Sequence, residues 1–392
     1  MTSKNLVALV GGGSGGHLTP LIPVAEKLKL KRADVRIVHI GQKGDPLNSI
    51  TKNAEVIDEQ LLVAAGKYRR YHGENWLVRL VDIRTFFFNV RDFFQFITGI
   101  FQAWFLLGKL KPRVILMKGG YVCAPVGIAA GLRGIPYVTH DSDAMVSLAH
   151  RIIAKKATFH LTAMDPELYL PQYSIDKTRQ VGVPVRADYT FVTKEDQARA
   201  RKKLGMSNDE KVLLVVGGGL GARNINNAII QNMNKLLAHK VTIVMITGHK
   251  LFAEVERSLG SLGLQENERE RIKTIAFSDE LHTLSAAADV VITRAGATNM
   301  AEFAAQGKAC IVVPSPFLAG GHQLKNAQAL EKTRATIVVD ESNISTLAEI
   351  ATMLLDDPKQ QAELSKNLHA IAHEDAAEKI ADTLLQIINE SA

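Results

Sequence analysis

Two segments of the chain begin with the same pattern, and this pattern restricts the possible folds more than any other feature. "VALVGGGSGGH" occupies residues 7–17, and "LLVVGGGLGAR" occupies residues 213–223. Each consists of an apolar run, a glycine-rich turn and a segment of helical length. A strand that enters a helix through a glycine turn is typical of the first unit of a doubly wound α/β sheet. The repetition predicts two such domains.

Further apolar runs continue this pattern through both halves of the chain. They are rich in β-branched residues, as expected for parallel strands that are buried on both faces. Segments of helical length separate them. The predicted strands are residues 5–10, 35–40, 114–117, 135–140, 158–163, 211–216, 241–247, 271–277, 289–293, 309–314 and 335–340.

The length of 392 residues is sufficient for two domains that each bury a core. A short connector containing proline, "VGVPVR" at 181–186, marks the predicted boundary. We expect an N-terminal domain over 1–184 and a C-terminal domain over 185–371, with a last helix at about 372–392 that packs back onto the N-terminal domain.

The composition excludes several classes of site. The two cysteines, Cys123 and Cys310, form no CxxC motif, which argues against a disulfide framework or a cysteine-based metal site and suits a reducing cytoplasm. The Asp-x-Asp segment at 141–143 has no supporting cluster, so we expect no metal and no cofactor. The uncharged stretch 93–108 is interrupted by polar residues, and we expect neither an export signal nor a transmembrane helix.

The first glycine turn satisfies G-x-G-x-x-G and could accept a phosphate, because glycine places no Cβ in its way and a helix follows. A dinucleotide site would also need an acidic residue at the end of the second strand. Gln42 follows that strand and Asp45 comes late, so NAD binding is disfavoured.

The turn ends in His17. Imidazole titrates near ~6.5, and the positive end of a helix favours its neutral form, which can accept a proton. We predict that His17 is a general base. The alternative is a solvated histidine at a helix start.

In the second half, residues 293–307 again follow a strand and begin a helix. The backbone of 297–299 would present N–H groups there, and Glu302 suits a ribose diol. The alternative for Glu302 is a carboxylate that only stabilises the helix dipole. The loop that follows the next strand contains sugar-type hydrogen-bonding residues, namely His322, Gln323 and Asn326.

Residues 67–113 are both basic and aromatic, with nine Lys/Arg against three Asp/Glu and 12 of the 23 aromatic residues. A stripe at helical spacing is expected to be mostly core; it consists of Val90, Phe93, Phe94, Ile97, Ile100, Phe101, Trp104 and Leu107. The surplus aromatic residues lie beside arginines, which favours an anionic lipid surface over nucleic acid. The predicted membrane contacts are Arg79, Arg84, Phe87, Phe88 and Arg91.

Seven motifs, taken in order, resemble those of the MurG family over nearly the whole chain. They are "GGGSGGHLTP", "KGGYVCAP", "HDSD", "VGVPVR", "VVGGGLGAR", "RAGATNMAEFAAQG" and "HQLKNA". Enzymes of this family transfer N-acetylglucosamine (GlcNAc) from UDP-GlcNAc to undecaprenyl-diphospho-muramoyl-pentapeptide (lipid I), which gives lipid II for peptidoglycan synthesis. The resemblance implies a GT-B fold, with two Rossmann-like domains that face each other across a cleft.

It further implies an inverting reaction without a metal, at the cytoplasmic face of the cell membrane, with proteins of cell-wall synthesis or division as possible partners. The resemblance assigns the substrate diphosphates to the first glycine loop and the donor to the second domain. The matching first-loop residues are Ser14, Gly15 and Gly16. The matching donor residues are Asp143, Arg186, Ser278, Ala297, Thr298, Asn299, Glu302 and Gln323. Gly219 in the second glycine turn and His322 are further predicted substrate contacts.

Several positions depart from the family pattern. Val183 replaces an asparagine, Gly219 and Leu220 replace a Ser-Gln pair, Asp141 replaces a glutamate and His150 replaces an asparagine. Asp143 stands where many members have asparagine. The alternative functions are a glycosyltransferase that acts on diacylglycerol, a UDP-GlcNAc 2-epimerase and a non-enzymatic scaffold on the membrane.

Overall fold

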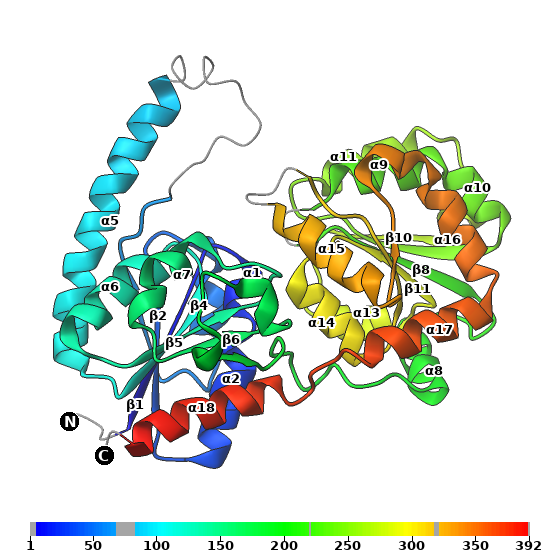
Figure 1. Cartoon of the computed structure of the whole chain (residues 1–392). Helices are drawn as coiled ribbons and strands as arrows, with labels where there is room; N and C mark the ends of the chain where they lie inside the picture. Colours follow the sequence, from blue (N-terminus) through cyan, green and yellow to red (C-terminus); the bar gives the residue numbers. More distant parts are fainter. Residues whose placement is uncertain (1–4, 68–82, 219–220, 317–320, 391–392) are drawn as a thin grey trace. The chain divides into compact units, whose positions relative to one another are not determined.

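The computed structural model describes residues 5–67, 83–218, 221–316 and 321–390, and the side chains of 83–86 are not among the parts described. The chain divides into two compact units: unit 1 comprises residues 1–186 and 373–392, and unit 2 comprises residues 187–372. Each unit contains a parallel β-sheet between helices (Figure 1). The predicted α/β class with two doubly wound sheets is therefore confirmed.

The sheet of unit 1 has seven strands in the order β3-β2-β1-β4-β5-β6-β7, and every described pair is parallel. One hydrophobic cluster covers each face of it, as the continuous apolar runs require. The strands are β1 (Leu6–Gly11), β2 (Arg36–Gln42), β3 (Glu59–Val63), β4 (Val114–Gly119), β5 (Tyr137–Asp141), β6 (Phe159–Thr162) and β7 (Thr178–Gln180).

The helices of unit 1 pack against both faces of this sheet. The last of them, α18, lies beside α2 (Figure 1), and Lys31 of α2 pairs with Glu378 and Asp382 of α18, each at 2.8 Å. The end of the chain therefore belongs to unit 1. The helices are α1 (Gly15–Leu18), α2 (Leu21–Lys31), α3 (Ser49–Lys52), α5 (Ile83–Leu110), α6 (Cys123–Arg133), α7 (Leu148–Ile153) and α18 (Ala376–Glu390), with 3-10 turns at Pro46–Asn48, Ala154–Lys156, Pro166–Tyr169 and Ile175–Lys177.

The two edge strands of unit 1, β3 and β7, are not among the predicted strands. Their sequences, "EQLLV" and "TRQ", are short and carry polar side chains. Both strands lie at an end of the sheet and pair with one neighbour only, so their outer edge is not covered by another strand. Their sequences therefore lack the continuous apolar run of a strand that is buried on both faces.

Helix α5 corrects the expected placement of the aromatic stripe. Of the eight stripe residues, only Leu107 is fully buried, whereas Phe93, Phe94 and Phe101 are each about 60% exposed. The helix packs against α6 through small residues such as Ala103, and Gly99 lies against the carbonyl of Ala64. A stripe of bulky rings therefore faces outward because the inward face has no room for it.

The sheet of unit 2 has six strands in the order β10-β9-β8-β11-β12-β13, all parallel where pairs are described. Hydrophobic clusters again cover both faces. The strands are β8 (Lys211–Val216), β9 (Val241–Ile246), β10 (Ile272–Ile275), β11 (Val290–Thr293), β12 (Ala309–Val312) and β13 (Ile337–Val338). The last predicted strand is thus reduced to two residues.

The helices of unit 2 precede, separate and follow these strands along the chain. They are α8 (Lys194–Lys203), α9 (Arg223–Gln231), α10 (Met233–Ala238), α11 (Phe252–Gly260), α12 (Glu266–Arg269), α13 (Leu281–Ala287), α14 (Ala297–Ala305), α15 (His322–Lys332), α16 (Leu347–Leu355) and α17 (Pro358–His369), with a 3-10 turn at Glu341–Thr346.

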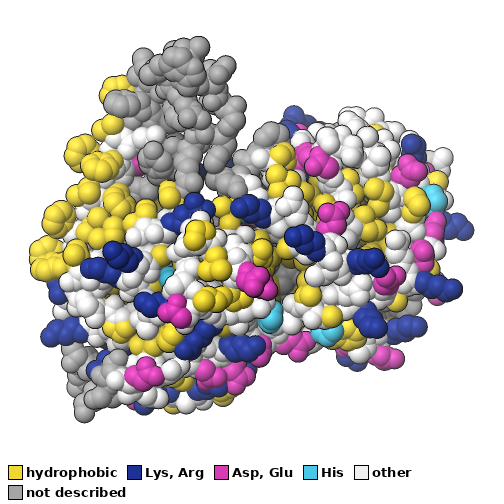
Figure 2. Space-filling view, in the orientation of Figure 1, with side chains coloured by type: hydrophobic (Ala, Val, Ile, Leu, Met, Phe, Trp, Pro, Cys, Tyr) yellow, Lys and Arg dark blue, Asp and Glu magenta, His cyan; other side chains and the backbone are white. Residues whose placement is uncertain are grey.

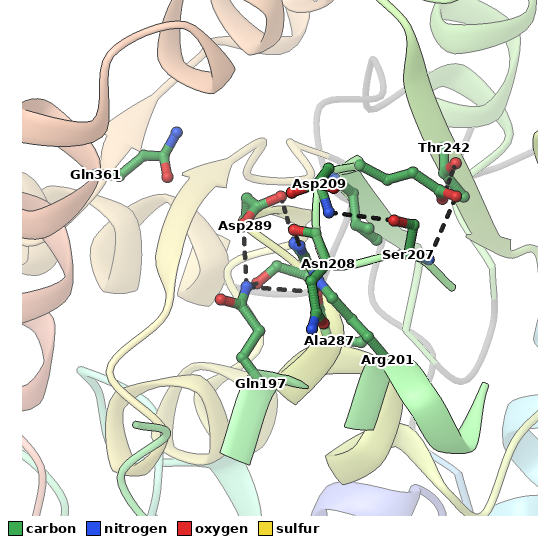
Figure 3. Close-up of polar contacts among 12 residues, drawn as sticks. Gln197, Arg201, Ser207, Asn208, Asp209, Thr242, Ala287, Asp289 and Gln361 are labelled. Atoms are coloured by element: carbon green, nitrogen blue, oxygen red, sulfur yellow. Dashed lines mark hydrogen bonds and ion pairs between the residues drawn. The ribbon is translucent and has the colours of Figure 1, made fainter. Parts of the chain in front are cut away.

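A buried polar network holds α8 against the start of the sheet in unit 2 (Figure 3). The guanidinium of Arg201, which is 4% exposed, donates to the carboxylate of Asp289 at 2.7 Å and to the carbonyls of Ala287 and Asn208. Asp289 also accepts from the backbone N–H of Val212 at 2.7 Å. The network lies at the amino ends of β8 and β11, so it supports the fold rather than a ligand at the carboxyl ends.

Candidate active site

In unit 1 the strand order reverses at β1, because β2 and β3 lie on one side of it and β4 lies on the other. Ligands of open α/β sheets bind at the carboxyl ends of the strands where the order reverses. There Gly11 of β1 pairs with Gly119 of β4, after an irregularity in the register. The glycine turn and His17 follow β1 directly, so the structure places the predicted base at this position.

The hydrogen bonds of His17 determine which ring nitrogen can accept a proton. Its Nδ1 lies 2.8 Å from the carbonyl oxygen of Gly12 and 3.0 Å from Oγ of Ser14. Because a carbonyl can only accept, Nδ1 carries the hydrogen and Nε2 carries the lone pair. The ring lies against Gly119, where a Cβ atom would stand 2.8 Å from Nε2.

The environment of His17 favours the neutral ring. Burial lowers its pKa to about 4, and the positive charge of Lys118 acts in the same direction. Helix α1 has only four residues. Burial and a nearby ammonium, rather than a long helix, therefore keep this imidazole unprotonated near neutral pH, as a base must be.

Asp45 takes one of the N–H groups of the glycine turn. It follows β2, and its Oδ2 accepts from the backbone N–H of Gly13 at 2.6 Å while Oδ1 accepts from that of Leu47 at 3.0 Å. A carboxylate inside the turn repels a phosphate at that donor. A phosphate would therefore have to meet the later part of the turn, where Ser14, Gly15 and Gly16 are partly exposed.

Lys118 is a member of this site that the sequence reasoning missed. It lies near the end of β4, its side chain is buried, and its Nζ donates to Oγ of Ser142 at 2.7 Å. Asp143, one of the predicted substrate residues, is partly buried and its charge acts on both Lys118 and His17. The carboxyl ends of β1, β4 and β5 thus bring together the imidazole of His17, an ammonium and two carboxylates.

Two departures from the family pattern are in contact with each other. The carboxylate of Asp141 accepts from Nδ1 of His150 at 2.9 Å, and both side chains are buried. Burial disfavours the charged form of each side chain, but the opposite charge and the hydrogen bond of the partner have a larger combined effect. The pKa of Asp141 is therefore lowered and that of His150 is raised. Tyr173 also donates to Asp141. His140 donates from Nε2 to the carbonyl of Gly182 at 2.8 Å.

In unit 2 the strand order reverses at β8, which lies between β9 and β11. Gly219 and Leu220, in the turn after β8, lie outside the described residues. Helix α14 begins after β11, and its first residues Ala297, Thr298 and Asn299 are partly exposed, as is Glu302. The predicted donor helix therefore starts at the carboxyl edge of this sheet.

Neighbouring loops of unit 2 are held to the start of α14. Asn326 of α15 donates from Nδ2 to the carbonyl of Ala295 at 2.9 Å. Gln323 is buried and accepts from the N–H of Ser315 at 2.9 Å through Oε1, which leaves its amide nitrogen as the end that can donate to a hydroxyl. His322, one residue earlier, is partly exposed.

The remaining predicted donor residues lie at the edges of the two units. Ser278 follows β10 and its Oγ accepts from the N–H of Glu280 at 3.1 Å. Beside it the exposed ring of Phe277 stacks on His249 at 5.6 Å between centroids. Arg186, partly exposed, ends the connector of unit 1.

An ion pair supports the carboxyl edge of the sheet in unit 2. Arg294, directly after β11, pairs with Glu341, and both side chains are nearly nine-tenths buried. Arg294 also donates to the carbonyl of Val313 at 3.1 Å, so it connects the ends of two neighbouring strands. Across the described ranges, no three His, Cys, Asp or Glu side chains form a group that could hold a metal ion.

The predicted membrane residues fall on and before α5. Arg79 lies outside the described residues, and of Arg84 only the backbone is described. Phe87 is 65% exposed, and Arg91 pairs with Asp92 at 2.8 Å while its guanidinium lies 5.1 Å from the ring of Phe88. By length and composition the stretch Phe87–Leu110 could cross a membrane, although one such helix is weak evidence for a span.

Two family models match the chain: the glycosyltransferase family 28 N-terminal domain over residues 7–162, and its C-terminal domain over residues 212–382. A relative from Salinibacter ruber is 31% identical over 386 residues, which are 97% of this chain and 96% of the relative. It is named UDP-N-acetylglucosamine–N-acetylmuramyl-(pentapeptide) pyrophosphoryl-undecaprenol N-acetylglucosamine transferase.

Solved structures share the fold of the chain. The crystal structure of Acinetobacter baumannii MurG superposes with a TM-score of 0.70 at 20% identity, covering 97% of this chain and 99% of that one. The UDP-GlcNAc 2-epimerase from Neisseria meningitidis, solved with UDP-GlcNAc, reaches a TM-score of 0.64 at 14% identity, covering 97% and 100%. The fold alone therefore does not separate transferase from epimerase.

Proposed function

Because this chain belongs to the MurG family within glycosyltransferase family 28, and is thus a UDP-GlcNAc-dependent glycosyltransferase, we propose that it converts lipid I into lipid II. In this proposal unit 2 binds the donor UDP-GlcNAc and unit 1 binds the acceptor. The observation that carries it is the state of His17, whose Nε2 holds a lone pair where the strand order reverses in unit 1.

The proposed reaction is a direct displacement at the anomeric carbon of GlcNAc. The 4-hydroxyl oxygen of the muramoyl sugar forms the new bond to this carbon as the bond to the UDP oxygen breaks. The electron pair leaves with UDP, and the hydroxyl proton goes to Nε2 of His17. Attack opposite to the leaving group inverts the configuration.

On the donor side, the leaving diphosphate needs positive partners. Helix α14 has nine residues and presents its first N–H groups at the carboxyl edge of the sheet, and such a helix end attracts phosphate. Arg186 would add a cation, so that the charge of UDP is balanced without a metal. Glu302 would hold the ribose, Ser278 and Phe277 the uracil, and His322 and Gln323 the sugar hydroxyls.

Substitution of Glu302 with alanine is expected to weaken UDP-GlcNAc binding about 10-fold or more, because hydrogen bonds to a charged group contribute about 1.5–3 kcal/mol. Isothermal titration calorimetry with UDP-GlcNAc measures this loss. Glu331→Ala is the matched control, since Glu331 is exposed on α15 in the same unit. Equal affinities for the two variants would contradict a ribose contact by Glu302.

The acceptor's lipid tail stays in the bilayer, so we propose that α5 binds the enzyme to the cytoplasmic face of the cell membrane. Figure 2 shows hydrophobic side chains gathered along the described part of this helix. Phe94, Phe101 and Phe105 are each more than 60% exposed. The other face of α5 packs on α6, which favours a helix that contacts the membrane with one side over a helix that crosses it.

Replacing Phe94 and Phe101 together with serine is expected to weaken binding to vesicles about 10-fold or more, because inserting an aromatic side chain contributes up to about 1.5–3 kcal/mol. Sedimentation with vesicles that contain anionic phospholipid measures the loss. The control pair Leu30→Ser and Met353→Ser removes two side chains that are at least as exposed but belong to α2 and α16. The proposal fails if both pairs bind vesicles alike.

Product analysis decides between the proposed function and its alternatives. The purified full-length protein is incubated with UDP-GlcNAc and either a lipid I analogue or diacylglycerol, and the products are identified by mass spectrometry. Lipid II supports the proposal. Glycosyl-diacylglycerol, UDP-N-acetylmannosamine or an absence of any product would instead indicate the glycolipid synthase, the epimerase or the scaffold.

A further inference from the structure

Lys118 occupies an unusual position for a lysine. It is 2% exposed in an interior strand, one residue before the point where β4 ends beside β1. Burying an ammonium is costly unless charged or polar partners surround it. Its only neighbour along β4 toward the site is Gly119, whose backbone lies against the ring of His17. Lys118 and the proposed base therefore lie at the same end of β4, and the charge of Lys118 acts on His17.

The partners of Lys118 come from three elements around the end of β4. Ser142, after β5, accepts its hydrogen bond at 2.7 Å. The carboxylates of Asp143 and Asp141 and the thiol of Cys123 at the start of α6 act on it as charges or dipoles. The hydrogen-bond acceptor of Lys118 is a neutral hydroxyl. This contact therefore does not cancel the positive charge that acts on the neighbouring groups, as an ion pair with a carboxylate would.

His17 in turn faces both signs of charge. Lys118 and the protonated His150 act against a positive ring, whereas Asp143 acts in favour of one, with the Gly12 carbonyl on Nδ1. On the side of the 3-10 turn at 46–48, Asp45 occupies the N–H of Gly13. A histidine beside carboxylates alone tends to become protonated and can then no longer accept a proton.

We propose that Lys118 is a positioning residue for the transfer reaction: its charge, fixed by Ser142, offsets the neighbouring carboxylates and keeps Nε2 of His17 free to accept the proton of the acceptor hydroxyl. This inference rests on the proposed function, in which His17 is the base. It deepens that function by naming a residue of β4 that keeps the base unprotonated. Lys118 itself need not touch the substrate.

The protonation states agree with this role. Burial lowers the pKa of Lys118 to about 8, and the two aspartates limit this effect, so the side chain remains mostly charged at pH 7. After burial, Lys118 is the next largest cause of the lowered pKa of His17. Removing the positive charge therefore leaves Asp143 less opposed and shifts His17 toward its protonated form.

The test is a titration of His17 by NMR in the full-length protein with labelled histidine, without substrates. The His17 signal is identified by its loss in His17→Gln. In the wild type we expect no titration of this ring between pH 5 and 8. In Lys118→Gln, whose amide can still donate to Ser142, we expect the midpoint to rise by about one pH unit, which makes the start of the titration visible above pH 5.

Lys308→Gln is the matched control, because Lys308 is also a buried lysine, 6% exposed, but lies in unit 2 and donates to the carbonyl of Ala288. It should leave the His17 signal unchanged. If Lys118→Gln does not fold, Lys118→Met, which is closer in length and apolar, replaces it. An unmoved His17 midpoint in the folded variant overturns the inference.

Kinetics separates Lys118 from a residue that binds the acceptor directly. We expect the acid limb of the kcat/KM profile to move to higher pH by the same amount in Lys118→Gln, with little change in the KM for lipid I. A raised KM with an unmoved pH profile would mean that the ammonium binds the acceptor anion instead. If the wild type makes no lipid II while the NMR shift occurs, the proposed function fails and the coupling of Lys118 to His17 stands.

Discussion

Replacement of His17 with glutamine is expected to lower turnover about 100- to 10,000-fold, the range that a general base contributes. The glutamine side chain is similar in size and can still donate to the carbonyl of Gly12, but it has no nitrogen that accepts a proton at neutral pH. Binding of UDP-GlcNAc, which we assign to unit 2, should be unchanged. Turnover of lipid I and calorimetric binding of UDP-GlcNAc measure the two effects separately.

His239→Gln is the control for this variant. His239 is an exposed histidine of unit 2 that pairs with Asp356 at the surface, at 3.3 Å, and its loss should leave turnover unchanged. The wild-type rate should also stay constant as the pH falls from 7 to about 5 and drop only near the pKa of His17, about 4, because the base is lost when it becomes protonated. Near-normal turnover of His17→Gln would remove His17 as the base.

Replacement of Arg201 with methionine is expected to destabilise unit 2 by about 3–5 kcal/mol. The change keeps the length of the side chain but leaves the partly buried carboxylate of Asp289 without its guanidinium (Figure 3). Breaking a buried pair by removing one partner has a cost of this order. For a unit of this size the Tm should fall by about 6–20 °C, which differential scanning calorimetry measures.

Arg199→Met provides the comparison on the same helix. Arg199 is 74% exposed and pairs with Asp196 on the surface of α8, and such a pair contributes only about 0–1 kcal/mol. Its loss should therefore shift the Tm by a few degrees at most. If the two variants unfold at the same temperature, the network around Asp289 does not stabilise unit 2 as described.

The local sequence pattern was sufficient to predict the strands that are buried on both faces. The continuous apolar runs of β1, β4, β8 and β11 are visible without any knowledge of their neighbours, and all predicted strands are present in the two sheets. The pattern failed where burial is one-sided. Edge strands β3 and β7 lack an apolar run, and the rings of α5 repeat at the spacing of a core helix although they face outward.

Sequence motifs also predicted where the candidate residues lie in each unit, but not the electrostatics around them. His17 and the start of α14 follow strands that any reading of the chain identifies, so their placement at the carboxyl edges could be predicted. Lys118 carries no motif of its own. Nor does the sequence show that Asp45 reaches the N–H of Gly13, or that the two departures Asp141 and His150 form a pair.

The sequence by itself thus determined the α/β class, the strand–turn–helix units, the family and the histidine at the end of the first glycine turn. Only the tertiary structure decided the charge state of that histidine, the partners of the buried charges and the exposed face of α5. The reason is physical: strand and helix signals arise from neighbours along the chain. Burial and charge–charge interactions depend instead on residues that only folding brings together, such as Lys118 and His17, 101 positions apart along the chain.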